Sequence, residues 1–418
     1  MPLKFWPRLS FILLALCVWA LPWQTKLILR PAASNYWEIS LFAGIFLLWL
    51  AILSLVLAGF INKNIWREKS RLWRWSLVLF LLSGAASIFI SPDPWLSFSR
   101  YLFWLSAASL FLGLASVPAS WRRSFLFIFL ASLSVQALIG LGQFFGQLSF
   151  ASSYLGLASH DAGAAGSVVI ETASGRWLRA YGASDHPNIF GGLMALASLT
   201  SIYLWTQIRE RNLRSVLLAA YVLFFTGLLV SFSRAAILAF VVGLIVSIWE
   251  HRTLLRAHGR GVVAWLSLSL LLVGLFGWQY QELIWERTQL SNRLEITSIN
   301  ERQEFNQRGL NNFFQHPFLG SGLGASTLYD QEKDLAAGLN HSAWSYQPAH
   351  NYWLLAAAEG GFVFALSLLG LWFCAYQKSR QSRLQGLFAV LLILTLFDHW
   401  LFTLPLAPSW LFFFFALI

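Results

Sequence analysis

The sequence has little charge and almost no cysteine, and each shortage excludes a class of protein. Only 11% of its 418 residues are charged, whereas a soluble domain carries about 25%. A chain this poor in charge could not cover a globular surface with polar groups. The two cysteines, Cys17 and Cys374, both lie in apolar runs, which excludes a disulfide framework and a cysteine-based metal site.

What the sequence has instead is a series of long apolar runs, with 57% hydrophobic residues. Runs of roughly 20 apolar residues are typical of membrane-spanning helices. They are too long for barrel strands, and backbone polar groups in lipid must be bonded internally. We predict an all-α polytopic membrane protein, a single transmembrane helical domain over 1–418 with about twelve spans. The runs lie near 9–29, 39–61, 75–91, 99–117, 124–145, 186–207, 215–231, 235–249, 262–280, 350–374, 384–403 and 406–418.

Basic residues alternate between the predicted loops. The net charge of +11 would suggest nucleic acid in a soluble protein, but here it indicates topology. Every second connection is short and rich in Lys and Arg, and such loops stay in the cytoplasm. We therefore expect both termini in the cytoplasm. The first run follows Lys4 and Arg8 like a signal peptide but lacks a small-x-small cleavage site, so we expect an uncleaved span.

Two predicted external loops are long. The first, 146–185, is rich in Gly, Ala and Ser and turns basic at 175–179. The second, 281–349, lies between spans 9 and 10. Its pattern near 300–314 predicts a short amphipathic helix that could lie at the membrane interface. The Gly-x-Gly-x-Gly at 320–324 is turn sequence; it is not a dinucleotide fingerprint, because no strand precedes it.

Two arginines lie at the outer ends of apolar runs. Arg234 occupies a tight polar turn between two short runs, where a charge needs a partner. Its guanidinium fork matches phosphate oxygens and would clamp an anion; the alternative is a buried ion pair with Glu359 or Asp398. Arg179 has no capping role. It is either a second anion ligand or an interfacial arginine whose head group reaches water.

His350 follows a break at Pro348 and precedes the next apolar run, where its imidazole is expected to stay wet. A histidine near its ordinary pKa can act as a general base; the alternative is a structural interfacial histidine. Asp185 or His186 is expected to cap the helix that Pro187 opens.

Three further polar residues lie in the last runs. Glu359 is expected to pack between helices or to form an ion pair, while Asp398 and His399 would line the same cavity as His350, on weaker grounds. No acidic pair has metal-site spacing, and the predicted outside loops contain no Asp-x-Asp. The sequence therefore implies neither a divalent metal nor a cofactor.

Together these residues predict a reaction at the outer membrane surface. Two arginines and a histidine under a polar loop would suit a donor that carries a diphosphate on a lipid tail. The arginines would neutralise charge on the leaving diphosphate, and the histidine would take the proton from an attacking hydroxyl. The predicted chemistry is glycosyl transfer by direct, inverting displacement.

At this point the chain resembles the O-antigen ligase and O-antigen polymerase superfamily over most of its length. The resemblance rests on the order of its motifs on the predicted loops. These motifs are RAYGASDHPNIF at 179–190, SFSRAA at 231–236, HPFLGSGLG at 316–324 and HNYWLLAAAEGG at 350–361.

The resemblance implies the substrates and the roles of single residues. Members of this superfamily transfer glycans from undecaprenyl diphosphate at the periplasmic face of the bacterial inner membrane. The acceptor would be a hydroxyl of lipid A core or a similar glycan or protein. His350 would be the base, and Arg179, Arg234 and Arg302 would bind the donor diphosphate. The matching motifs also contribute supporting residues, which are His186, Asn188, Asn351 and Glu359.

Three activities of this superfamily stay open, and so does a transport function, which belongs to another class of protein. Ligation to lipid A core is favoured over polymerisation of repeat units and over transfer to protein hydroxyls. Related sequences have also been described as bicarbonate transporters. A transporter would need ionisable residues at mid-span, where this sequence has little besides Glu359.

Overall fold

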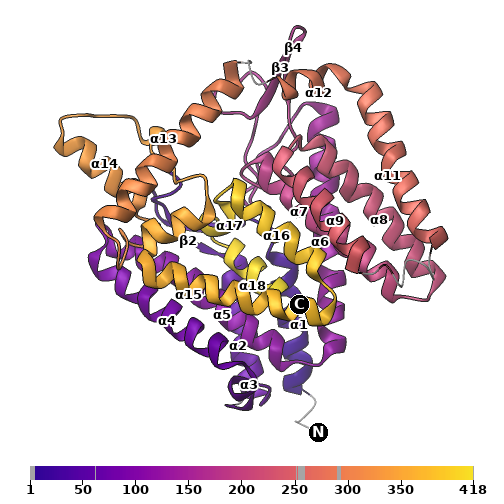
Figure 1. Ribbon diagram of the computed structural model, residues 1–418, viewed down its shortest axis with the longest axis horizontal. Coiled ribbons are helices and arrows are strands. Elements are labelled where there is room, and N and C mark those ends of the chain that lie inside the picture. The colour runs from indigo at the N-terminus through magenta and orange to yellow at the C-terminus, as the bar shows by residue number, and fades with distance from the viewer. Residues whose placement is uncertain (1–4, 62, 251, 253–258, 290–292, 418) are drawn as a thin grey trace.

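The computed structural model describes residues 5–417 except 62, 251, 253–258 and 290–292. Within these residues the regular structure is helical apart from two short antiparallel hairpins, as Figure 1 shows. The helices are α1 (Phe5–Ala20), α2 (Ala43–Leu57), α3 (Lys63–Glu68), α4 (Arg71–Ser87), η2 (Ile88–Ile90), α5 (Pro94–Ser116), α6 (Ala119–Gly146), α7 (Pro187–Gln207), α8 (Arg211–Val230), α9 (Arg234–Glu250), α11 (Gly259–Gln279), α12 (Gln281–Thr288), α13 (Arg293–Gln315), α14 (Ser326–Ala336), η3 (Ala343–Ser345), α15 (Tyr352–Ser382), α16 (Gln385–Phe397), α17 (Trp400–Thr403) and α18 (Ala407–Leu417). The hairpins are β1 (Lys26–Arg30) with β2 (Ile39–Phe42), and β3 (Val169–Thr172) with β4 (Gly175–Leu178).

Six of the described helices are long and apolar enough to cross a membrane, which confirms the all-α polytopic class. They are α4 with η2, α5, α6, α7, α8 and α15. Helices α11 and α12 would add a seventh if this pair, bent by 89°, forms one span. A straight span needs about 20 residues, and α1, α2, α16 and α18 are shorter. The number twelve therefore stays a prediction.

The first predicted run, 9–29, is wrong at its outer end. Helix α1 ends at Ala20, and the chain then enters β1 at Lys26. Pro22 follows the helix end, and its missing N–H cannot continue the helical bonding. Strand β1 instead pairs with β2 just before α2 begins.

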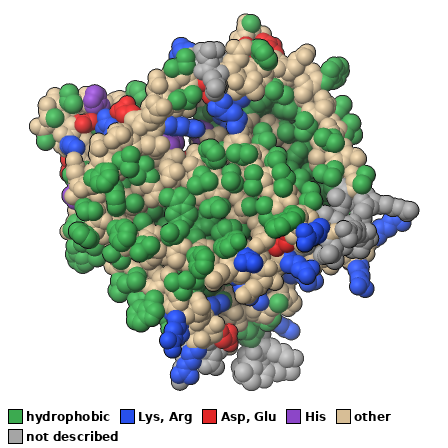
Figure 2. Space-filling view, in the orientation of Figure 1, with side chains coloured by type: hydrophobic (Ala, Val, Ile, Leu, Met, Phe, Trp, Pro, Cys, Tyr) green, Lys and Arg blue, Asp and Glu red, His purple; other side chains and the backbone are tan. Residues whose placement is uncertain are grey.

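Apolar side chains form a band across the middle of the molecule, with Lys and Arg gathered below it and beneath α12 and α13 (Figure 2). Helices α7 and α18 lie inside the bundle. Every residue of 407–416 is buried, and α18 packs against α5. Charged ends with an apolar band between them are the arrangement expected of a helix bundle embedded in lipid.

Helix α15 is broken at Gly361, whose φ of 75° no helix contains. The loop 317–324 bonds the free backbone groups at the break. Ser321 N donates to Ala358 O at 2.9 Å, and Phe362 N donates to Pro317 O at 2.7 Å. Irregular backbone at membrane depth is tolerated only where protein satisfies it. The loop and the first part of α15, which follows His350, are therefore one structural unit.

Helix α13 confirms the amphipathic helix predicted near 300–314 and extends it in both directions. In Figure 1, α13 and α12 arch over the end of the bundle opposite α3, beside the β3–β4 hairpin. Of the apolar side chains on this helix, Phe305 is buried, whereas Leu310 and Phe314 are exposed. Its buried side therefore covers the end of the bundle at which the candidate site lies.

We expect Gly320→Ala to destabilise the protein far more than Gly338→Ala. Both glycines have a left-handed backbone, with φ of 70° and 78°, which costs a residue with a Cβ about 1–2 kcal/mol. A Cβ at Gly320 would also lie 2.2 Å from the carbonyl carbon of Glu359, whereas nothing lies within 4 Å of one at Gly338. Thermal unfolding in detergent, followed by tryptophan fluorescence, measures both losses. Equal losses would show that loop 317–324 is not docked on α15.

Candidate functional site

The segment that enters α7 is held by its own capping residue. His186 is the N-cap of α7, and its Nδ1 accepts a hydrogen bond from Asn188 N at 3.0 Å. Pro187 opens the helix, as predicted, because a first-turn residue needs no N–H. The cap turns the side chain of Asn188 toward the site, where it bonds two charged groups.

Arg179 is buried, with 3% of its surface exposed, so it is not an arginine that reaches into water. Its Nε donates to Ser231 O at 2.7 Å, and its Nη2 donates to Asn188 Oδ1 at 2.9 Å. These bonds leave Nη1 without a partner among the described residues. Burial, followed by the positive charge of Arg287, holds the pKa of Arg179 well below its usual range. An anion at this position would relieve both effects.

His350 precedes α15, whose N-cap is Asn351. Its ring lies 5.9 Å from the ring of Phe305 and 4.8 Å from that of His399. The structure corrects the expectation of a wet imidazole, because Nδ1 is buried without a partner among the described residues. Burial, together with the neighbouring His399, lowers the pKa of His350 far below its ordinary value. The ring is therefore neutral at pH 7 and able to accept a proton.

Asp398 joins the arginine side of the site to the histidine side. Asn188 Nδ2 donates to Asp398 Oδ2 at 3.3 Å, and His399 N donates to Asp398 Oδ1 at 2.8 Å. Burial alone would raise the pKa of Asp398, but His399 and His350, when they are protonated, bring it below the usual range. The carboxylate is therefore ionised, and it favours a positive charge on the imidazoles around it.

Arg302 brings a second cation to His350. The structure gives this half-buried side chain no hydrogen bond or ion pair among the residues it describes. Its charge lowers the pKa values of His186 and His350. The structure thus brings together Arg179, Arg302 and His350, three of the residues predicted from sequence.

Arg234 has a different partner from either one expected. Its Nη2 lies 2.5 Å from Glu295 Oε2, so the predicted ion pair with Glu359 or Asp398 is wrong. Glu295 also pairs with Arg287. The sequence analysis identified neither residue, because nothing in a charged loop distinguishes a carboxylate that becomes buried on folding.

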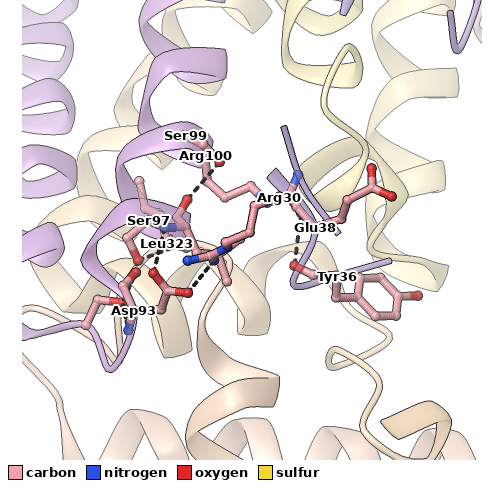
Figure 3. A network of polar contacts seen from close by, with 10 residues as sticks. Arg30, Tyr36, Glu38, Asp93, Ser97, Ser99, Arg100 and Leu323 are labelled. Carbon is pink, nitrogen blue, oxygen red and sulfur yellow. Dashed lines mark hydrogen bonds and ion pairs between the residues drawn. The ribbon is translucent and has the colours of Figure 1, made fainter. Parts of the chain in front are cut away.

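Glu359 lies in a second polar network, which holds the loops rather than the site. Its carboxylate accepts hydrogen bonds from Gly324 N at 2.6 Å and from Ser326 Oγ at 2.8 Å. The neighbouring Arg100 donates to Tyr36 O at 2.9 Å (Figure 3). Glu359 therefore bonds the loop at Gly324 and Ser326, which differs from the predicted helix-packing or ion-pair role.

Figure 3 shows how this network fixes the β1–β2 hairpin and the loop 317–324 on the start of α5. Arg30 pairs with Asp93, and Ser97 Oγ donates to Leu323 O at 2.8 Å. The ring of Tyr36, on the same side of the molecule, packs edge-on against His399 at 6.2 Å. The β1–β2 connection therefore supports one wall of the candidate site.

His350, Asp398 and His399 each place a ligand atom within 4.8 Å of the others. A set of two imidazoles and a carboxylate is one that Zn²⁺ accepts, and Nδ1 of His350 is free to ligate. The charge of Arg302, however, acts on all three groups and opposes a dication beside them. The residues present therefore fit a metal poorly, and the absence of a metal stays a prediction.

These features define a helical membrane protein with a cationic, histidine-containing site at one end of its bundle. Residues 219–369 match the family model described as O-antigen ligase. The chain therefore carries a segment that is similar to O-antigen ligases and that spans about a third of its length. The matched segment includes Arg234, Arg302 and His350 but not Arg179. A search of the curated proteins found no match.

Acidification is expected to destabilise the protein, and His350→Gln to weaken that effect. The pKa values of His186, His350 and His399 are all lowered on folding, so the unfolded chain binds more protons below about pH 6.5. Stability is then complete above this pH and falls as the pH drops toward the folded values. Removing one such imidazole should reduce the slope of the free energy of unfolding against pH by up to about 1.4 kcal/mol per pH unit.

Unfolding midpoints measured between pH 7 and pH 4 test this sign and slope. His341→Gln removes a histidine that is exposed and serves as the control, with a slope like that of the unmodified protein. An unchanged slope in His350→Gln would contradict the burial of a neutral imidazole.

Proposed function

We propose that this protein is an inverting glycosyltransferase that moves a glycan from undecaprenyl diphosphate to an acceptor hydroxyl. The acceptor would be lipid A core or a similar glycan, and the site would face the periplasm. The observation that carries the proposal is the meeting of Arg179, Arg302 and His350 around one half-buried carboxylate, Asp398. The match of residues 219–369 to the O-antigen ligase model supports the same reaction class.

The arginines would hold the diphosphate as it leaves. Arg179 and Arg302 each have N–H groups free of partners among the described residues, and guanidinium forks bond phosphate oxygens in pairs. Arg234, at the start of α9, would add a third cation. Because these charges neutralise the leaving group, the reaction would need no metal. No metal is included in the proposed mechanism.

His350 would act as the general base. The acceptor oxygen would attack the anomeric carbon while its proton passes to the neutral imidazole. The bond between that carbon and the diphosphate oxygen would break, and undecaprenyl diphosphate would leave with the electron pair. Asp398 would stabilise the imidazolium so formed, as a nearby carboxylate does for other histidine bases.

An apolar groove that reaches Trp353 supports a donor with a long hydrocarbon tail. The groove has a volume of about 1030 Å³ and is lined by α4, α9, α15 and α16. Trp353 lies on its wall, three residues after His350, and its Nε1 bonds Thr395 Oγ1 at 3.2 Å. A lipid-linked diphosphate in this groove would present its head group to the arginines.

The distribution of charge supports the orientation. Basic side chains lie near α3 as well as beneath α12 and α13 (Figure 2). The Lys- and Arg-rich connection 63–74, which contains α3, is at the end of the bundle opposite α13. Basic loops remain in the cytoplasm, so the site would face outward from the bacterial inner membrane with both termini inside. This placement is where lipid-linked glycans meet their acceptors.

His350→Ala should abolish release of polyprenyl diphosphate from a labelled donor. The assay uses protein in lipid, candidate acceptors and no added metal, with His341→Ala as the matched control. Loss of the base is expected to slow transfer about 10²–10⁴-fold. The product would separate ligase, polymerase and protein glycosyltransferase.

Release that does not depend on His350 would refute its role as the base. No release with any acceptor from a folded sample would overturn the proposed reaction and direct work to solute flux, the prediction of a transporter.

Arg234→Lys should lose most of the transfer activity, although it keeps the charge. A lysine offers a point charge and cannot reproduce the paired N–H groups of the guanidinium. The control is Arg293→Lys, at an arginine whose side chain is 74% exposed and pairs with Glu171. Initial rates at saturating and limiting donor measure the effect. Full activity in Arg234→Lys would show that this arginine has a structural role alone.

A further inference from the structure

One ion-pair cluster lies beside the proposed diphosphate site without being explained by it. Glu295, in the first turn of α13, is 5% exposed. One carboxylate oxygen lies 2.5 Å from Arg234 Nη2, and the other pairs with Arg287 Nη1. A single buried carboxylate therefore joins two arginines from different elements, one at the start of α9 and one at the end of α12.

The backbone holds these two guanidiniums together despite their like charge. Arg287 Nε donates to Phe232 O at 3.5 Å, and Arg234 Nη1 donates to Arg287 O at 3.4 Å. The side chain of Arg234 is 44% exposed, whereas that of Glu295 is only 7% exposed. Arg234 and Arg287 thus form an anion site that is partly exposed to solvent. A carboxylate of the protein itself occupies this site.

The same cluster is continuous with the proposed active site. Arg287, Arg234 and Arg302 all act on the buried Arg179 as neighbouring positive charges. Glu295 and Arg302 are seven residues apart on α13, which places them on one face, two turns from each other. Further along that helix, Phe305 contacts His350. One face of α13 therefore contacts both the anion site of Arg234 and Arg287 and the proposed base.

We propose that Arg287 is a further diphosphate ligand beside Arg234, and that Glu295 is an internal stand-in for a donor phosphate. Its carboxylate occupies the anion site between the two arginines until the donor displaces it. This inference rests on the proposed function. Its geometric basis is that two carboxylate oxygens, each paired with a different arginine, imitate two oxygens of one phosphate. The stand-in keeps the like-charged arginines together in the absence of donor, because an unbalanced pair would repel.

A stand-in and a permanent brace predict opposite effects of Glu295→Gln. If the carboxylate competes with phosphate, its neutral isostere should bind a diphosphate more tightly. If it only braces the arginines, its loss should weaken binding. Glu304→Gln is the matched control, because it removes the same charge from the same helix at an exposed pair with Arg308.

The test is binding of inorganic pyrophosphate to the full chain in nanodiscs, measured by calorimetry. We expect Glu295→Gln to bind at least about threefold more tightly than Glu304→Gln, and Arg287→Gln to bind at least about tenfold more weakly than the unmodified protein. The affinity of Arg287→Lys should fall between those of Arg287→Gln and the unmodified protein. A Glu295→Gln variant that binds like Glu304→Gln, or more weakly, would overturn the stand-in, and unchanged binding in Arg287→Gln would remove Arg287 from the site.

The same titration separates this inference from the proposed function. His341→Ala should bind pyrophosphate like the unmodified protein, because this exposed histidine lies outside the proposed site. If the unmodified protein binds no pyrophosphate, both the diphosphate donor and the stand-in are refuted. If it binds while Glu295→Gln shows no gain over its control, the stand-in alone is refuted. Thermal unfolding of each variant shows whether a loss of binding is a loss of fold.

Discussion

A buried arginine at the α13 end of the bundle is the constraint on which the site depends. Arg179 is almost inaccessible to water, and a buried cation is costly unless polar groups surround it. Its two hydrogen bonds reach the α8–α9 turn and the start of α7. Through Asn188 the same bonding extends to Asp398, at the end of α16. The hydrogen bonds around one guanidinium thus bring together three helix ends that are distant in sequence.

The backbone imposes a second constraint of the same kind. The break in α15 at Gly361 leaves peptide groups that lipid cannot solvate, and the loop 317–324 bonds them. Glu359 then holds the end of that loop through Gly324. The first part of α15, which begins beside His350, is positioned by this loop as much as by its neighbouring helices.

Sequence reasoning anticipated features that depend on local chemistry. The cap at His186, the turn at Arg234, the amphipathic helix of residues 293–315 and the helix that follows His350 all arise from residues close together in sequence. It did not anticipate the partner of Arg234 or the burial of His350. Those outcomes depend on packing between helices, which no local pattern encodes.

The same limit applies to the parts of the site that sequence reasoning missed. Arg234 and Glu295 are 61 residues apart, and Asn188 and Asp398 are 210 apart. Neither pair has a spacing that a motif could capture. The predicted chemical roles of Arg179, Arg234, Arg302 and His350 stay predictions, because a position near other charges does not establish catalysis.

The bond between Asn188 and Asp398 has a consequence for biogenesis. A nascent chain delivers Arg179 and Asn188 to the membrane long before the segment that carries Asp398 has been made. During that interval the arginine lacks the carboxylate that completes its polar surroundings, and the imidazoles lack theirs. The site is therefore assembled only when the late helices dock, so an incompletely inserted chain has no complete site.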